Sequence, residues 1–465
     1  MVSMIDYSFL TIQNPWWQDK RLIEEDDHIE GFNLSKVKYI PRSVLDLELK
    51  NGAINIVCGP RQTGKTTALK LLVKSLLEQQ IPAERIFYFN CDALESRKDI
   101  IELVLSFFDG IKEPSGKIPQ NYLFLDEISS VTDWPYAVKW LADNGLLANS
   151  KIILTGSSSI SLKKSGEFLP GRRRGGRDIN FLPISFFEDL KLVLPKFPLR
   201  EKVNSFEELK RLDKQLQKKR INIKQSYKDF LLTGGFLRMI NSFVKKEPFL
   251  DTVELYKSTL KSELAKWGKR ELYARRVLKK VISSLTSETS YSSVAEEAEL
   301  GSKNTAVEYL NFFGDSFLLA ETLFYSIPQK RVVVKKNKKY YPTDPFLFWI
   351  FNSFVSGSNQ IEEFYRRYSK PPLDSQTAEA FVASELYKSG LKFYFFRNKK
   401  ELDFYIPKKD LGIEVKYKPR IFSYDLKGLG YAKRKVIVSK NTLEKRGEVL
   451  IVPTYLFGLV NLAKI

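Results

Sequence analysis

One short stretch of the chain combines glycine, lysine and threonine at the spacing of a phosphate-binding loop. It begins at Gly59, ends at Thr66 and reads G-x-x-x-x-G-K-T. Glycines let backbone N–H groups turn towards phosphate oxygens, and a following helix adds the partial positive charge of its N-terminus. Lys65 can reach the β- and γ-phosphates, and the Thr66 hydroxyl can bind Mg²⁺. We therefore expect ATP and Mg²⁺ as cofactors, with contacts along the loop from Gly59, Pro60, Arg61, Gln62, Thr63, Gly64, Lys65, Thr66 and Thr67.

A pair of acidic residues follows an apolar run further along the chain. Residues Tyr122–Leu125 lead directly into Asp126 and Glu127. Apolar residues followed by two acids are typical of a central parallel strand that ends at the active edge of a sheet. Asp126 is then placed to hold Mg²⁺ through water, and Glu127 to orient and polarise the attacking water. The alternative is a solvated acidic pair, but together with the loop this pair predicts an ATPase.

Two further segments carry groups that could act on a nucleotide. An apolar strand at residues 151–154 precedes Thr155 and Ser157, either of which could sense the γ-phosphate or belong to an ordinary turn. Residues 169–177 then place four arginines among glycines. Arg172 is the favoured candidate for a catalytic arginine finger that reaches the ATP of a neighbouring subunit. Contact with a nucleic-acid backbone, or a merely solvated basic loop, are the alternatives.

A second constellation of acids and a lysine lies near the C-terminus. Glu414 and Lys416 are two residues apart on a strand and therefore share a face, and Asp403 on a neighbouring strand can meet them. Glu379, preferred to Glu385 because it lies on the buried side of its helix, completes a candidate nuclease site. Carboxylate oxygens suit a second Mg²⁺ or Mn²⁺, which would activate water against a phosphodiester. The alternative is an amphipathic strand whose acid and lysine pair on a wet surface.

The elements that must position these residues alternate over the first 190 residues. An apolar run at 53–58 precedes the glycine loop, and a helical pattern from 67 to 73 follows it. A strand at 85–89 and a helix at 100–108 continue the alternation. This pattern predicts an α/β fold with a parallel P-loop NTPase sheet covered on both faces. Residues 1–50 form a lead-in to this core.

The pattern changes after the core. Residues 191–255 are predicted as a helical lid and linker, and residues 351–465 as an α/β domain that holds the acidic constellation. Between them, residues 256–350 show three helical segments followed by a very basic hairpin, which is typical of a winged helix-turn-helix. Its second helix can enter a major groove while the lysines of the wing meet phosphates. A helical adaptor with solvated lysines is the alternative.

Composition narrows the classes of function. The chain of 465 residues carries 75 Lys and Arg against 55 Asp and Glu, a net charge of +20, which favours a DNA or RNA partner. His28 is the only histidine, so a histidine-based triad or multi-histidine metal site is excluded. The two cysteines, Cys58 and Cys91, lie in apolar settings and indicate buried thiols. We expect a cytoplasmic protein without a membrane partner, because no apolar stretch approaches ~20 residues and no secretory signal is apparent.

With these residues in place, the sequence resembles a large family of archaeal and bacterial AAA+-type ATPases. The matching segments are Asn14–Trp17, Gly59–Thr67, Leu125–Glu127, Leu154–Ser159, Leu169–Arg173, Pro183–Glu188, Gly234–Phe236, Glu379–Val382, Glu401–Phe404 and Ile413–Lys416. The resemblance implies an AAA+-like core with a helical lid, a winged-helix module and a C-terminal domain similar to PD-(D/E)xK nucleases. It also implies that the arginine after Leu-Pro-Gly, here Arg172, is a candidate for the finger.

Three functional hypotheses follow. The first is an ATP-hydrolysing protein that binds duplex or branched DNA, in which nucleotide state controls DNA engagement and the C-terminal domain is a candidate for metal-dependent cleavage. The second is a nucleotide-gated DNA-binding regulator without nuclease activity. The third is a protein-interaction ATPase whose basic surface meets acidic partners. An arginine supplied to a neighbouring subunit would make the protein a homo-oligomer.

Overall fold

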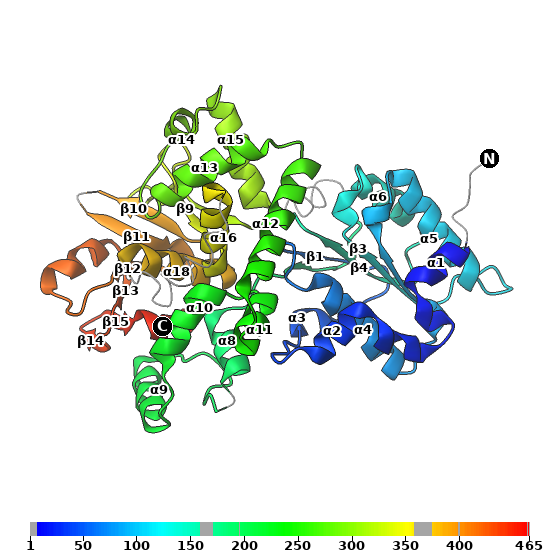
Figure 1. The fold of residues 1–465 in the computed structure, drawn as a ribbon, viewed down its shortest axis with the longest axis horizontal. Helices are drawn as coiled ribbons and strands as arrows, with labels where there is room; N and C mark the ends of the chain where they lie inside the picture. The colour runs from blue at the N-terminus through cyan, green and yellow to red at the C-terminus, as the bar shows by residue number, and fades with distance from the viewer. Residues whose placement is uncertain are drawn as a thin grey trace. The chain divides into compact units, whose positions relative to one another are not determined.

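A computed structural model describes residues 7–158, 171–194, 196–357, 374–398, 400–462 and 464 (Figure 1). The expectations for Ser159 and for the Leu169-Pro170 dipeptide fall outside these residues. The chain forms two compact units: residues 1–182 with 315–317, and the remainder from 183 onwards. Among the described residues, no helix is long and apolar enough to cross a membrane.

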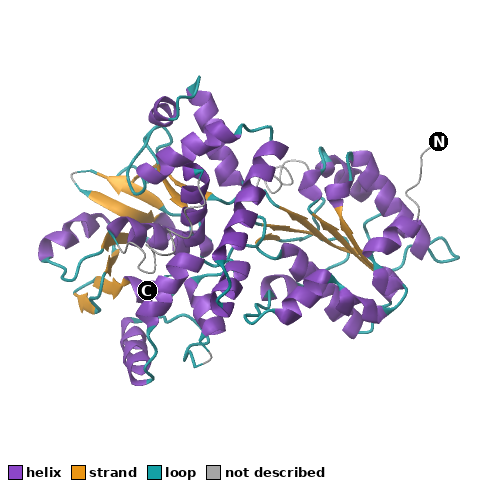
Figure 2. Ribbon diagram, in the orientation of Figure 1, coloured by secondary structure: helices purple, strands orange, loops and turns teal. Residues whose placement is uncertain are grey.

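The first unit is built on a five-stranded parallel sheet with the order β2-β3-β4-β1-β5. Its strands are β1 (Ile54–Cys58), β2 (Ile86–Asn90), β3 (Asn121–Asp126), β4 (Ser150–Gly156) and β5 (Asp178–Asn180). The first four are apolar almost throughout because helices cover both faces of the sheet. Helix α4 (Lys65–Glu78) lies on one face and α5 (Arg97–Ile111) with α6 (Trp134–Asp143) on the other (Figures 1 and 2). The predicted parallel α/β core is confirmed.

The N-terminal lead-in packs onto this sheet through short helices. These are α1 (Tyr7–Gln13), η1 (Pro15–Trp17), η2 (Lys20–Glu25), α2 (Asp27–Leu34) and α3 (Arg42–Leu45). Trp16 is fully buried, and its indole N–H donates to the carbonyl of Ile86 at 3.0 Å. Asn14 holds the same strand by donating to the carbonyl of Tyr88 at 2.9 Å and accepting from its N–H at 2.8 Å. The lead-in therefore fixes β2 beside the acid-bearing strand β3.

The second unit opens with helices that the sequence assigned to a lid and linker. They are α8 (Phe186–Val193), α9 (Phe206–Lys218), α10 (Ile223–Thr233), α11 (Leu237–Lys245) and α12 (Phe249–Lys266). Helix α9 is strongly charged but buries Leu209, Leu212 and Leu216 on one side. Helices α8 to α10 share one apolar core with the C-terminal sheet, so they pack as part of this unit.

Three helices and short antiparallel strands follow in the order that the sequence predicted for residues 256–350. The helices are α13 (Glu271–Ser283), α14 (Tyr291–Glu297) and α15 (Lys303–Asp315). Strand β6 (Leu319–Thr322) pairs with β9 (Lys339–Pro342), and β7 (Tyr325–Ser326) pairs with β8 (Arg331–Val332). The assignment of this arrangement as a winged helix stays a prediction.

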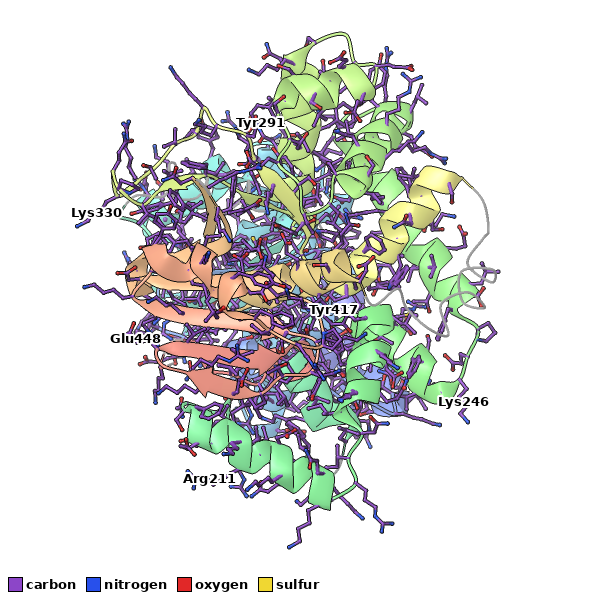
Figure 3. All side chains as sticks on the ribbon, turned by 90° about the vertical axis from the view of Figure 1, so that its left-hand side faces the viewer. Arg211, Lys246, Tyr291, Lys330, Tyr417 and Glu448 are labelled. Carbon is purple, nitrogen blue, oxygen red and sulfur yellow. The ribbon has the colours of Figure 1, made fainter. Side chains whose placement is uncertain are left out.

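A six-stranded mixed sheet with the order β10-β11-β12-β13-β15-β14 completes the unit. The strands are β10 (Tyr394–Arg397), β11 (Glu401–Ile406), β12 (Leu411–Lys416), β13 (Arg434–Ser439), β14 (Glu444–Arg446) and β15 (Val449–Pro453). Figure 3 shows them side by side, with Glu448 in the turn between the last two. Helix α16 (Pro345–Ser356) follows β9, and α18 (Ser375–Lys388) packs on one face of the sheet.

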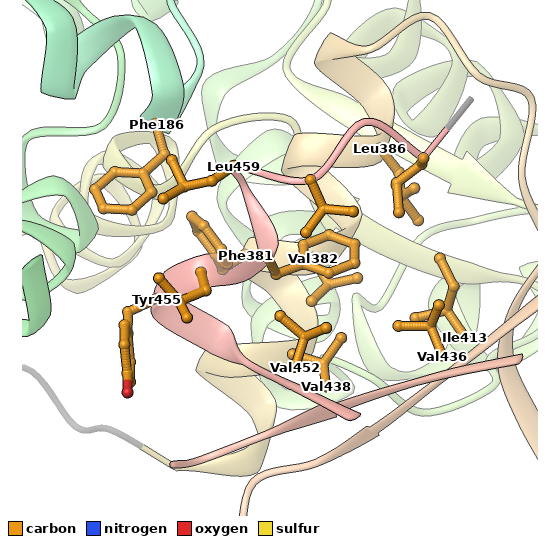
Figure 4. Close-up of a cluster of buried hydrophobic side chains, with 14 of the residues drawn as sticks. Phe186, Phe381, Val382, Leu386, Ile413, Val436, Val438, Val452, Tyr455 and Leu459 are labelled. Carbon is orange, nitrogen blue, oxygen red and sulfur yellow. The ribbon is translucent and has the colours of Figure 1, made fainter. Parts of the chain in front are cut away.

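One of the apolar cores of the second unit lies beneath α18. Phe381 and Val382 of this helix meet the sheet residues Ile413 and Val438 (Figure 4). Phe186, at the start of α8, packs edge-to-face against Phe381, with ring centroids 5.9 Å apart. Burial of these side chains fixes α18 and its acidic residues against the sheet.

Candidate functional site

The glycine loop follows β1 and opens α4, as the sequence predicted. Gly64 has φ +97°, a left-handed conformation that favours glycine, and it caps α4. A Cβ on Gly59 would lie 1.9 Å from the carbonyl oxygen of Phe181, so only glycine fits there. The Thr63 hydroxyl donates to the carbonyl of Pro60 at 2.8 Å and closes the loop on itself.

The lysine of the loop is held inside it. Lys65 is only 4% exposed, and its ammonium donates to the carbonyls of Gly59 at 3.0 Å and Pro60 at 3.2 Å. The same ammonium lies 3.3 Å from Oε1 of Glu127. The structure therefore brings the predicted phosphate ligand and the predicted water-orienting acid into contact.

The carboxylate of Asp126 is fully buried and accepts hydrogen bonds from three hydroxyl groups. Thr66 donates to its Oδ2 at 2.7 Å, Tyr88 to the same oxygen at 2.9 Å, and Thr155 to Oδ1. Thr155 also accepts from the backbone N–H of Glu127 at 2.9 Å. Thr155, one of two candidates for a γ-phosphate sensor, thus touches both acids.

Sequence reasoning missed Tyr88. Burial raises the pKa of its phenol well above the ordinary value, and the charge of Asp126 adds to the rise, so the hydroxyl stays protonated and donates. A single hydroxyl between Phe87 and Phe89 in an apolar strand was the only signal in the sequence.

The loop and its acids fit ATP with Mg²⁺. The Thr66 hydroxyl and the Asp126 carboxylate put hard oxygen donors side by side at 2.7 Å, which is the chemistry that Mg²⁺ prefers. Lys65 supplies a buried cation at the place where the loop would hold phosphates.

The favoured arginine is bound within its own unit. Arg172 donates from Nη2 to Oδ2 of Asp143 at 3.1 Å and from Nε to Oδ1. This bond lowers the pKa of the Asp143 carboxyl. Neighbouring Arg173 has another task, because its guanidinium donates to the carbonyl of Ile54 and pairs with Asp178.

The four residues of the candidate nuclease site come together in the second unit. Phe404 pairs with Ile413 across β11 and β12, which places Asp403 opposite Glu414. Asp403 accepts from the N–H of Val415 at 2.7 Å, and the Lys416 ammonium lies 2.5 Å from Glu414. Burial raises the pKa of Glu379 to about 8, and the charge of Asp403 adds to this rise.

A lysine that the sequence assigned to the basic wing lies among these acids. Lys339 of β9 is 1% exposed, and its ammonium lies 3.2 Å from Glu379 and 2.5 Å from Glu401. Tyr341 also donates to Glu379 at 2.6 Å. Burial lowers the pKa of Lys339, but the charges of Glu379, Asp403 and Glu401 raise it by more than burial lowers it. The ammonium therefore stays charged.

One expectation needs correction here. Lys338 and Lys339 are buried and do not present their charges to phosphates as wing lysines. The second metal stays a prediction, and the ammonium of Lys339 already places a positive charge beside Glu379 and Glu401. Across the part of the chain that the structure describes, no three acidic, histidine or cysteine side chains are arranged to hold a metal ion.

Comparisons with known proteins identify the first region. Residues 51–190 match the model of an AAA domain, and residues 224–353 match a domain of unknown function, DUF8612. An uncharacterized protein of Methanocaldococcus jannaschii is 23% identical over 350 residues, which cover 72% of this chain and 71% of that protein. An uncharacterized protein of Haemophilus influenzae is 25% identical over 310 residues, covering 63% and 67%.

Solved structures show a weaker similarity. The ORC2 protein of Aeropyrum pernix aligns over 73% of this chain and 98% of its own, with 12% identity and a TM-score of 0.38. The ORC1 protein of the same organism in complex with DNA aligns over 76% and 98%, with 11% identity and a TM-score of 0.31. The AAA match carries the assignment: the predicted P-loop ATPase domain is present.

Proposed function

Proceeding from an AAA domain at residues 51–190, we propose that the protein hydrolyses ATP and that its nucleotide state controls how it engages DNA. One observation carries the hydrolysis: Lys65 with Glu127, and Thr66 with Asp126, meet where the start of α4 faces the end of β3. A binding loop alone would serve any nucleotide-binding protein, whereas the buried acidic pair adds the means to use water.

Each residue then has a defined task. The N–H groups of the loop and Lys65 would hold the phosphates, and Thr66 and Asp126 would hold Mg²⁺. Bound Mg²⁺ would neutralise charge on the phosphates. Because Lys65 now pairs with Glu127, transfer of the lysine to phosphate would release this carboxylate to orient the attacking water. The ion pair would thus keep the acid inactive until nucleotide binds.

DNA engagement is supported by charge and by the basic hairpin. The chain carries a net charge of +20. Lys330, Arg331, Lys335 and Lys336 are exposed between β7 and β9, and Figure 3 shows Lys330 projecting outward. Exposed cations of this kind bind phosphates and position a duplex without reading its sequence.

The test is DNA affinity in defined nucleotide states. Fluorescence anisotropy with linear, forked and four-way DNA would be compared without nucleotide, with ADP and with a non-hydrolysable ATP analogue. We expect the affinity for at least one DNA form to differ about fivefold or more between states. Lys65→Ala should bind DNA but lose this difference. Equal affinity in all three states, or no DNA binding, would refute the proposal.

Metal-dependent cleavage is the second candidate, because Glu379, Asp403, Glu414 and Lys416 converge. Lys339 in the same cluster favours the alternative of a regulator without nuclease activity. Incubation of the protein with each DNA form and Mn²⁺ separates the two. We expect intact DNA. Cleavage that disappears in both Asp403→Ala and Lys416→Ala would establish the nuclease instead.

The arginine finger remains part of the proposal and implies a homo-oligomer. To reach a neighbouring subunit, Arg172 must first leave Asp143. Mixing inactive Lys65→Ala with inactive Arg172→Ala subunits should restore ATP turnover, because mixed assemblies contain sites with both intact groups. A monomer with full turnover would exclude this role.

A further inference from the structure

Two aromatic rings stand exposed on the segment that follows β12. Phe422 is 48% exposed and Tyr424 is 52% exposed. Their ring centroids lie 5.5 Å apart with an interplanar angle of 9°, so the rings are stacked in parallel. Large rings normally gain stability by burial, and a stacked pair left in solvent indicates a surface that binds something.

The backbone that carries the rings is fixed. Ile421 is buried, and its carbonyl accepts from the guanidinium of Arg446 at 2.8 Å. Asp425 accepts from the N–H of Phe422 at 2.8 Å and from the ammonium of Lys418 at 2.7 Å. These bonds hold the start of η7 (Ser423–Tyr431), so little ordering would be needed when a ligand stacks on the rings.

Basic residues flank the pair in the sequence. Residues 416–427 contain four basic residues, Lys416, Lys418, Arg420 and Lys427, and one acid, Asp425, which is buried and paired. The ammonium of Lys418 lies 5.5 Å from the centroid of Phe422 and 4.8 Å from that of Tyr424. Arg420 and Lys427 are exposed. An apolar protein partner would have to desolvate these cations, whereas a polyanion would neutralise them.

We infer that Phe422 and Tyr424, with Lys418, Arg420 and Lys427, form a binding site for single-stranded DNA. Unpaired bases stack on the two rings while the cations contact the phosphates. The bases of duplex DNA are not free to stack on the two rings, because they already stack on one another. The segment that carries the site follows Tyr417, which comes directly after β12 and is labelled in Figure 3. The inference rests on the proposed DNA function and adds the form of DNA that this surface takes.

The experiment compares binding of a dT oligonucleotide and of a blunt duplex by anisotropy. The variants are Phe422→Ala/Tyr424→Ala, the ring-preserving Tyr424→Phe, and Trp140→Ala, which removes a ring that is 44% exposed in the other unit. We expect the double variant to bind dT about tenfold or more weakly, with duplex affinity unchanged within about twofold. Tyr424→Phe and Trp140→Ala should bind both ligands as the parent does. Circular dichroism checks that each variant is folded.

The outcomes separate this inference from the proposed function. If the parent protein binds neither ligand, DNA engagement itself fails. If the parent binds DNA and the double variant binds dT equally well, only the inference fails. An equal loss for dT and duplex would also overturn it, since the segment would then be a general basic surface. Tighter binding of a U oligonucleotide than of dT would assign the site to RNA.

Discussion

Three hydroxyl groups from three elements converge on the buried carboxylate of Asp126. Thr66 lies at the start of α4, Tyr88 in β2 and Thr155 in β4. The sequence identified Thr66 and Asp126 because their motifs are local. The sequence could not pair Tyr88 with Asp126, which lies 38 residues away. The residues of one strand do not indicate which side chain of a neighbouring strand will contact them. The same holds for Lys339 and Glu379.

Removal of the tyrosine hydroxyl tests whether this network positions Asp126. Tyr88→Phe deletes one donor without changing the packing of the ring, and one such bond contributes about 1 kcal/mol. We expect Mg²⁺-dependent ATP turnover to fall about threefold to tenfold. Tyr122→Phe is the control, since Tyr122 only accepts from Lys151 at 3.1 Å. Equal turnover in Tyr88→Phe and the parent would show that Asp126 needs no support from β2.

A buried acid predicts a pH-dependent stability. Burial raises the pKa of Asp189 from 3.8 to about 8, with Asp229, Asp344 and Glu385 adding to the rise and Lys388 opposing it. The folded state favours the protonated form of the Asp189 carboxyl. The contribution of this protonated group to the free energy of unfolding is complete below pH 3.8 and is lost as the pH rises to about 8. Chemical denaturation should show a loss on the order of 4 kcal/mol between pH 5 and 8 that Asp189→Asn greatly reduces. Parallel profiles for the two proteins would contradict this.

At the scale of elements, the chain passes from one unit to the other at residues 182 and 183, and backbone hydrogen bonds hold it within each unit. The N–H of Phe181 donates to the carbonyl of Cys58 at the end of β1, at 2.6 Å. Within the second unit, Ile184 donates to the carbonyl of Gly235 at 3.0 Å and accepts from Lys388 at 3.0 Å. Two conspicuous sequence segments, Pro183–Glu188 and Gly234–Phe236, therefore meet.

The glycine at this meeting point has no room for a side chain. A Cβ on Gly235 would lie 1.9 Å from the carbonyl oxygen of Ile184. We expect Gly235→Ala to destabilise the second unit by about 2 kcal/mol or more, because the backbone must move. Gly301→Ala is the matched control, since a Cβ there meets nothing within 4 Å. Thermal unfolding of both variants tests this, and we expect a lower midpoint temperature for Gly235→Ala than for Gly301→Ala. Equal midpoint temperatures would contradict the steric argument.

Element order was more predictable than burial. The helices α13 to α15 and the strands β6 and β9 follow the periodicity and turn residues of residues 277–341. The same reasoning predicted that Lys338 and Lys339 are exposed, because a run of lysines in a hairpin is typical of a solvated wing. Their burial depends on contacts made by the folded chain: Lys338 with backbone carbonyls, and Lys339 with Glu379 and Glu401.

At the scale of the whole molecule, the positive net charge should make the affinity for DNA depend on salt concentration. Lys335→Ala/Lys336→Ala removes two exposed charges from the hairpin, and Lys112→Ala/Lys117→Ala removes two exposed charges from the first unit. We expect duplex affinity of the parent to fall at least ~10-fold between 50 and 200 mM salt. The hairpin variant should bind more weakly and show a shallower slope, while the control resembles the parent. Identical slopes for both variants would assign the attraction to charge in general, and no salt dependence would support a protein partner.

The division of the molecule could be predicted only in part. The alternation of strands and helices predicted the parallel α/β core of the first unit, because each strand and helix has a local sequence pattern. The shared core of α8 to α10 with the C-terminal sheet had no local signature. It joins Phe186 to Phe381 and Val203 to Val460, pairs that only the folded chain brings together.

ATP turnover by two variants tests the central claim most directly. Lys65→Ala removes the buried cation of the loop, and Glu127→Gln keeps the size of the side chain but removes its charge. With ATP and Mg²⁺, phosphate release should be lost in both, while Glu127→Gln still binds ATP. Turnover by folded Lys65→Ala and Glu127→Gln at the parent rate would contradict the account.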